Sequence, residues 1–231
     1  MALILTFKQP LKHLSFLSEY NFEQINDLTY KLVSKANEEP ITSINDYAFS
    51  SCTSLKSVVI PNSVTSIRNN AFMGCTSLKS VIIPDSVITI GIYAFNHCES
   101  LKSVVIPNSV NTIGFETFSY CTSLKSVVIG DSVKTIGFGA FESCKSLKSV
   151  VIPDSVNTIS KFAFHRCTSL ESVVISDSVI SIQTDVFSHC PSLKTVIING
   201  QTTEYLKEYF KTNYPKIDLE FYLEYNDYLL K

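Results

Sequence analysis

The chain lacks the features that would place it in a membrane or on a secretory route. No apolar run in its 231 residues approaches the roughly 18 residues that a bilayer-spanning helix needs. Its first residues, MALILTFKQPLKHLSF, carry no basic segment ahead of the short apolar run, so they do not resemble a signal peptide. There is also no Asn-x-Ser/Thr glycosylation site. These absences favour an intracellular protein, although some surface proteins carry no recognisable signal.

Charge is scarce as well. Charged residues make up 17% of the chain and the formal net charge is -2, whereas a nucleic-acid-binding surface needs clustered lysine and arginine. We therefore expect no nucleic-acid partner. Apolar residues make up 45% of the sequence, which is enough for a continuous core and argues against a disordered chain.

A 23-residue repeat dominates the rest of the sequence. One cysteine and one phenylalanine recur at this fixed spacing through most of the chain. The cysteines are Cys52, Cys75, Cys98, Cys121, Cys144, Cys167 and Cys190, and the phenylalanines are Phe49, Phe72, Phe95, Phe118, Phe141, Phe164 and Phe187. Such a period predicts a solenoid, in which each repeat forms one coil that stacks on its neighbours.

Each coil combines a short strand, a turn and a compact apolar segment. In the repeat that reads SLKSVVIPNSVTSI, the β-branched residues 58–60 lie between a Ser-Leu entry and a Pro-Asn-Ser turn, which predicts a strand. Residues 64–67 are expected to form a second, shorter extended segment. The Ala-Phe-x-x-Cys segment that follows is too short for a full helix, and we expect a 3₁₀ turn or a single helical turn there.

The repeat resembles a known family. Leu55-x-x-Val58-x-Ile60 is similar to a leucine-rich repeat with Ser63 in place of the usual asparagine, and the IPxSV turn and AFxxC segment resemble the 23-residue BspA-type, Treponema-like form. The match covers about residues 41–199. The resemblance implies an α/β repeat fold, a curved right-handed leucine-rich-repeat solenoid of about seven coils with a parallel sheet on one face. It also implies protein binding and, in many members, surface adhesion.

The two ends depart from the repeat, and each is expected to cap one end of the solenoid. Residues 1–40 form the expected N-terminal cap, with an amphipathic helix at about residues 22–36 that begins at a capping box of Asn21 and Gln24. Residues 200–231 form the expected C-terminal cap, with a helix that stops before Pro215 and a final extended segment, IDLEFYLEY. This tail is rich in tyrosine, and a docking surface is the alternative to a cap.

The repeated cysteines and the few histidines do not form a pattern typical of chemistry. Stacked coils bring like positions to roughly 4.8 Å, but side chains that point the same way do not converge as a disulfide requires. We expect buried, reduced thiols that fill space in the core. His97 and His189 each precede a cysteine but lie four coils apart, and His13 and His165 are isolated. With no CxxC pair, phosphate loop or GxSxG motif, the sequence predicts no catalytic residue, no metal site and no cofactor, and gives no positive case for an enzyme.

One outward-facing position on the predicted sheet is aliphatic in every coil. Period-2 alternation directs the residue between Val58 and Ile60 outward, yet it is valine or isoleucine each time. The predicted partner-binding residues at this position are Val59, Ile82, Val105, Val128, Val151, Val174 and Ile197. Six spacings make the row about 29 Å long. It is either an interaction site or a relic of repeat duplication at a strand position that favours β-branched residues.

A row of lysines runs beside these aliphatic residues. The predicted partner-binding lysines are Lys56, Lys79, Lys102, Lys125, Lys148 and Lys194, and Glu171 interrupts them. The two rows suit a protein partner with an apolar centre and an acidic rim, whereas solubility is the ordinary role of such lysines. We therefore expect a non-catalytic protein–protein interaction module, and a self-associating structural or surface adhesion protein is the alternative. Away from the sheet, Ile92, Phe115 and Phe138 form the best candidate for a second site, which coil-to-coil drift explains equally well.

Overall fold

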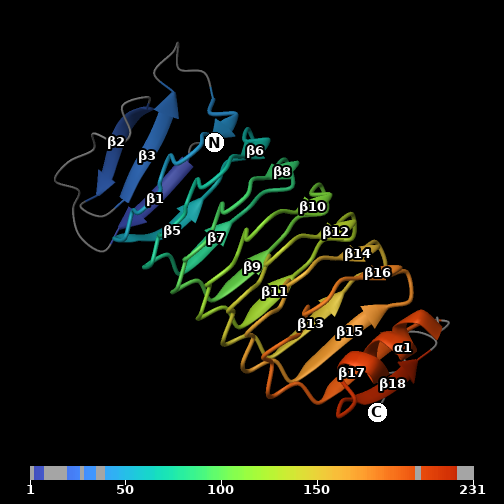
Figure 1. Cartoon of the computed structure of the whole chain (residues 1–231). Helices are drawn as coiled ribbons and strands as arrows, with labels where there is room; N and C mark the ends of the chain where they lie inside the picture. The colour runs from blue at the N-terminus through green and yellow to red at the C-terminus, as the bar shows by residue number, and fades with distance from the viewer. Residues whose placement is uncertain (1–2, 8–19, 27–28, 35–39, 201–203, 223–231) are drawn as a thin grey trace.

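The chain folds as an elongated stack of coils with its first and last strands at opposite ends (Figure 1). The computed structural model describes residues 3–7, 20–26, 29–34, 40–200 and 204–222. Within residues 40–200, each 23-residue coil contributes one strand to each of two faces of parallel strands, which we call the larger sheet and the second sheet although the strand pairing on each face is interrupted. Among the described residues, no helix is long and apolar enough to cross a bilayer.

The larger sheet is built from the predicted strands around residues 58–60 of each repeat. Its strands are β5 (Leu55–Val59), β7 (Ser80–Ile82), β9 (Ser103–Val105), β11 (Ser126–Val128), β13 (Ser149–Ile152), β15 (Ser172–Ser176) and β17 (Thr195–Asn199). Equivalent residues pair in register, as Val58 does with Val81. Val58 is buried and Val59 is exposed, which is the alternation that a pleated strand imposes.

The second sheet is made of two-residue strands that end the residue 64–67 segment of each repeat, as the sequence predicts. They are β4 (Ser43–Ile44), β6 (Ser66–Ile67), β8 (Thr89–Ile90), β10 (Thr112–Ile113), β12 (Thr135–Ile136), β14 (Thr158–Ile159) and β16 (Ser181–Ile182). The isoleucine of each pair is buried, so every coil contributes apolar side chains to the core from both sheets.

The prediction of a 3₁₀ or helical turn at Ala-Phe-x-x-Cys is wrong for residues 40–200, where this segment forms hydrogen-bonded turns. Its backbone amides alternate between two kinds of acceptor. The amide of Phe95 donates to Thr117 O in the next coil at 2.9 Å, whereas the amide of Asn96 donates to Tyr93 O in the same turn at 3.1 Å. Left-handed backbone at Tyr93 and His97, with φ of 56° and 57°, allows this alternation. Stacking between coils therefore overrides the local tendency to form a helical turn.

Stacked phenylalanines form the centre of the core. Neighbouring rings lie 5.1 to 5.5 Å apart between centroids, with interplanar angles of 2° to 11°. The ring of Phe118, for example, is fully buried between Phe95 and Phe141. A single coil has no such neighbours, so the packing depends on repetition.

The predicted N-terminal helix at residues 22–36 is wrong. Two strands, β2 (Tyr20–Asn26) and β3 (Thr29–Ser34), occupy most of that range and pair antiparallel. β3 also pairs with β1 (Leu3–Phe7), and β1 pairs antiparallel with β5 at the end of the solenoid. The physical reason lies in successive open edges: β1 pairs with the edge of β5, β3 then pairs with the other edge of β1, and a helix cannot supply those hydrogen bonds.

The C-terminal helix and the final strand are both found where the sequence places them. Helix α1 (Glu204–Asn213) ends before Pro215, and β18 (Asp218–Tyr222) adds to β17 in parallel. Phe210 on α1 is fully buried and lies 6.1 Å from Phe187, so it continues the phenylalanine stack at the same 23-residue spacing. The helix lies at the C-terminal end of the stack of coils (Figure 1).

Candidate functional site

The outer face of the larger sheet carries a short row of exposed aliphatic side chains, which we name the apolar stripe. Val59, Ile82, Val105, Val128 and Val151 are 37% to 59% exposed. Val59 pairs in register with Ile82 and Val105 pairs in register with Val128. With Val151 on the next coil, the row extends over about 19 Å, taking four spacings of roughly 4.8 Å. The prediction of an outward-facing aliphatic position is confirmed for these five coils.

The stripe is shorter than the sequence indicates. Val174 is 7% exposed and Ile197 is 1% exposed, so neither belongs to an open surface. The expected length of about 29 Å is therefore wrong. The alternation of a strand reports which face a side chain lies on, but not whether another part of the chain covers that face.

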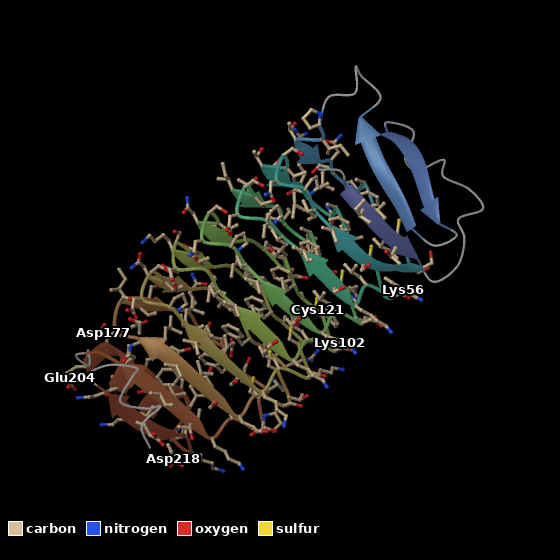
Figure 2. All side chains as sticks on the ribbon, turned by 180° about the vertical axis from the view of Figure 1, so that it is seen from behind. Lys56, Lys102, Cys121, Asp177, Glu204 and Asp218 are labelled. Atoms are coloured by element: carbon tan, nitrogen blue, oxygen red, sulfur yellow. The ribbon has the colours of Figure 1, made fainter. Side chains whose placement is uncertain are left out.

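Two rows of charged or polar side chains border the stripe on opposite edges of the sheet. The predicted lysines lie on one edge, and all are exposed except the half-buried Lys56. The other edge carries the asparagine or aspartate of each turn, which follows proline in four coils, glycine in one and serine in one. These residues are Asn62, Asp85, Asn108, Asp131, Asp154 and Asp177. Figure 2 shows Lys56 and Lys102 at one edge and Asp177 at the other. The face is thus apolar along its middle, positive along one edge and negative along the other.

The interruption of the lysine row has a local consequence. The carboxylate of Glu171 lies 3.8 Å from the ammonium group of Lys148, and both side chains are more than half exposed. An exposed pair of this kind contributes at most about 1 kcal/mol. We therefore regard Glu171 as an interruption of the positive edge, which continues at Lys194, and not as a structural anchor.

The second predicted site, on the turn side of the coils, is larger than the sequence indicates. Phe115 and Phe138 stack at 4.8 Å, and Ile92 beside them is 43% exposed. Tyr93 meets the ring of Phe115 at 5.3 Å, and Phe162 meets the ring of Phe138 at 5.5 Å, both edge to face. The signal that could have revealed Tyr93 and Phe162 is their position, one residue after the column that contains Ile92, Phe115 and Phe138.

The cysteines are free and, apart from the half-buried Cys190, buried, as predicted. From Cys75 onward each thiol also donates to the carbonyl oxygen of a phenylalanine in the preceding coil, as Cys121 does to Phe95 O at 3.3 Å. Burial raises the pKa of Cys121 to about 12. The thiols therefore stay protonated and act as hydrogen-bond donors between coils. No group of histidine, cysteine and acidic side chains among the described residues has the geometry of a metal site.

Comparisons with known proteins agree with this architecture. The family model described as BspA type leucine rich repeat region matches residues 15–148 and 134–226, in six copies. The chain belongs to the BspA-type leucine-rich repeat family. It is similar to the crystal structure of a T. pallidum leucine-rich repeat protein, with 28% identity, a TM-score of 0.55, and coverage of 73% of this chain and 86% of that one.

A second solved structure supports the fold alone. The pneumococcal vaccine antigen PcpA is 20% identical, with a TM-score of 0.51, and the alignment covers 73% of this chain and 56% of that one. No curated protein sequence matches the chain. The comparisons therefore establish a leucine-rich repeat protein of the kind that generally mediates protein interactions or surface adhesion, without a specific partner.

The last coil of this leucine-rich repeat solenoid meets three tyrosines that sequence reasoning did not assign individually. The amide of Ile182 donates to the Tyr205 hydroxyl at 2.7 Å, and the amide of Phe187 donates to the Tyr214 hydroxyl at 3.0 Å. The Tyr209 hydroxyl donates to Gln183 O at 2.9 Å. In earlier coils the backbone of the next coil partners the corresponding groups, as when Phe164 N donates to Val186 O.

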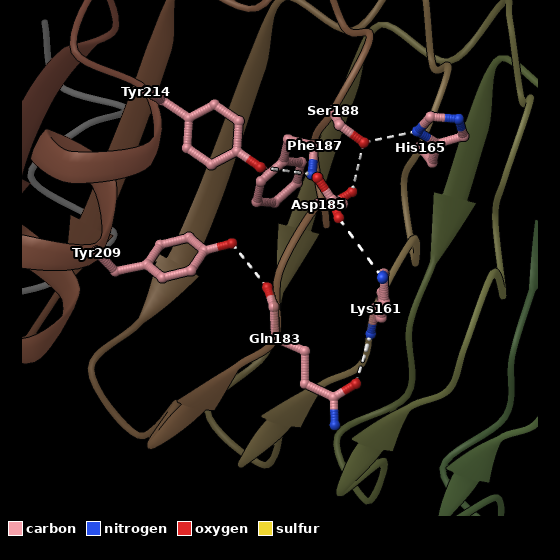
Figure 3. A network of polar contacts seen from close by, with 8 residues as sticks. All are labelled: Lys161, His165, Gln183, Asp185, Phe187, Ser188, Tyr209 and Tyr214. Carbon is pink, nitrogen blue, oxygen red and sulfur yellow. Dashed lines mark hydrogen bonds and ion pairs between the residues drawn. The ribbon is translucent and has the colours of Figure 1, made fainter.

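Side-chain contacts extend this network into the preceding coil (Figure 3). Ser188 Oγ donates to Asp185 O at 2.8 Å and lies 2.6 Å from His165 Nδ1. Burial, His189 and Arg166 lower the pKa of His165, against weaker opposing effects of Asp185 and of the Ser188 backbone. The C-terminal tyrosines thus attach to an already ordered polar network.

Proposed function

We propose that this protein is a non-catalytic interaction module that binds a protein partner through the outer face of its larger sheet. In this proposal residues 41–199 are a right-handed solenoid, and residues 1–40 and 200–231 cap its two ends. The observation that carries the proposal is the apolar stripe, a contiguous aliphatic row that is exposed in five successive coils. Monomeric proteins seldom leave such a row uncovered unless it meets another surface.

The rigidity of the sheet supports this use. Val59 and Ile82 stand on paired strands, as do Val105 and Val128, so little conformational entropy is lost when a partner docks. A partner that fits has an apolar centre to cover the stripe. Acidic groups along one border would face the lysine row, which selects the orientation more than it adds affinity.

A triple substitution tests the proposal. Val105, Val128 and Val151 are each replaced by threonine, which is also β-branched and so retains strand propensity. The matched control replaces Ile88 and Ile180, exposed at 54% and 72% outside the stripe, with threonine. Affinity enrichment from the native cells, followed by titration of each enriched protein, should show binding lost only in the stripe variant. If the stripe and control variants bind every partner as the unmodified protein does, the proposal is wrong.

A second candidate is self-association, and the opposite charge of the two sheet edges favours it. Rotating a second copy by 180° about the long axis of the stripe keeps the two stripes in contact. The same rotation places the lysine row of each copy against the aspartate and asparagine row of the other. Sedimentation at low and high salt distinguishes the candidates, because a dimer of this kind is salt-sensitive and is lost in the stripe variant.

A further inference from the structure

A groove on the turn side, near the C-terminal end, has a lining unlike the rest of the surface. Its volume is about 760 Å³, within the range of small-molecule sites. Four successive coils contribute to it, and Tyr214 closes the end next to α1. The groove is lined by apolar atoms of Phe187, Tyr214 and Cys190. It is also lined by the nitrogen-bearing side chains of Lys145, Arg166 and His189. No carboxylate lines the groove.

Comparison of the coils within this one chain shows that the lining departs from the repeat. The residue after the column cysteine is threonine at positions 53, 76, 122 and 168. It is lysine at Lys145 and proline at Pro191, and both of these residues line the groove. The strand residues of the same coils are nearly identical from one repeat to the next. Two of the three coils that lack threonine at this position therefore contribute the replacing residue to the groove.

The residue before the column cysteine also varies among the coils that form the groove. Every member of this column has left-handed backbone, with φ between 57° and 72°, which costs about 1 kcal/mol or more for a residue other than glycine. Gly74 shows that glycine fits this position, yet the groove coils place Tyr120, Arg166 and His189 there. The left-handed backbone is common to all coils, and His97 outside the groove shares it, so the distinguishing feature of the groove is which side chains stand there.

The geometry points to a binding site for a small organic anion with an aromatic body. The ring lies against Tyr214 and Pro191, and the carboxylate or phosphate lies between Lys145 and Arg166. Arginine favours such ligands because its planar guanidinium forms paired hydrogen bonds with an anion. Glu142 interacts electrostatically with Arg166, but Glu142 does not line the groove. This site is separate from the sheet face and does not rest on the proposed function.

Titration of the ¹⁵N-labelled full chain with phenylacetate and with phenyl phosphate tests the site. We expect saturable amide shifts confined to the groove, with millimolar affinity for at least one of the two anions. Benzyl alcohol, which lacks the charge, and acetate, which lacks the ring, should each bind about tenfold more weakly. A preference between the two aromatic anions identifies the anionic group.

Two substitutions that restore the repeat sequence test whether the anion binds at the groove. Lys145→Thr and Arg166→Ser introduce the residues that other coils carry at the same columns, so both are compatible with the fold. Together they should weaken binding about tenfold or more. Lys134→Thr, which introduces the residue found at Thr65 in the same column, should leave binding unchanged. The proposal is overturned if neither anion gives a saturable shift, if acetate binds as well as phenylacetate, or if Lys134→Thr weakens binding equally.

Discussion

Replacing Tyr214 with phenylalanine removes the hydroxyl that accepts the backbone amide of Phe187 at 3.0 Å. The ring is retained, so its edge-to-face contact with Phe187 at 6.1 Å is expected to survive. Phe187 is 2% exposed, and water does not readily replace the lost acceptor. Leaving a buried amide without a partner costs about 1–3 kcal/mol, so the free energy of unfolding should fall by that amount.

Amide hydrogen exchange gives the sharper readout of this substitution. The Phe187 amide should lose protection in Tyr214→Phe, and the Ile182 amide should not, because it donates to Tyr205 instead. Tyr205→Phe should show the converse pattern. Each variant is therefore the control for the other, and both are compared with the unmodified chain by denaturant titration.

One outcome would refute the reasoning. If Tyr214→Phe unfolds at the same denaturant concentration as the unmodified chain and Phe187 keeps its exchange protection, the hydroxyl does not stand in for the backbone of a further coil. A uniform loss of protection along the whole chain would also count against it, because the prediction concerns one amide at one end of the stack.

Three further predictions concern the core and its titrating groups. Phe118→Ala should lower the free energy of unfolding by about 3–5 kcal/mol, because the ring is fully buried, and Phe138→Ala, at a half-buried position, should lower it less, both measured by denaturant titration. Cys121 should resist iodoacetamide at pH 8 until denaturant is added, as mass spectrometry would report, because the thiol is buried and its pKa is raised to about 12. The pKa of His165 is lowered in the folded chain, so the contribution of this side chain to the free energy of unfolding is complete above the unfolded-state pKa of about 6.5. That contribution is lost as the pH falls through the folded-state pKa. His165→Gln should therefore lose less stability than the unmodified chain between pH 7 and 5.

The fold of the central region could be predicted because one unit is repeated with little change. A buried residue such as Phe72 recurs every 23 positions, and stacking then forces all its equivalents into one row. No other arrangement buries every member of the row at once. The family resemblance rests on the same residues and is shown independently by the match to residues 15–148 and 134–226.

The ends could not be predicted as reliably because their structure is set by the solenoid they meet. Residues 22–36 show the spacing of an amphipathic helix, but β1 pairs with the open edge of β5, and β3 and β2 extend the sheet from β1. Periodicity in a short segment reports only which side chains are apolar. It does not report which backbone groups nearby lack hydrogen bonds.

The left-handed turns were missed for a related reason. Residues such as Arg166 and Phe162 rarely adopt positive φ, so nothing in their identity indicates it. The inter-coil bond from Arg166 N to Ser188 O at 3.0 Å compensates for the local strain. Tertiary hydrogen bonding therefore decides the conformation against local preference.

The two candidate surfaces differ in what repetition says about them. At the apolar stripe, valine or isoleucine persists at a position where packing does not require it, but duplication alone would also preserve it. At the groove, residues change where their neighbours stay constant, as Lys145 does beside an unchanged cysteine. Duplication cannot produce a cluster of changes in one place, and drift alone has no reason to collect cations and exclude carboxylates there. The groove is therefore the surface on which a single pair of substitutions is most informative.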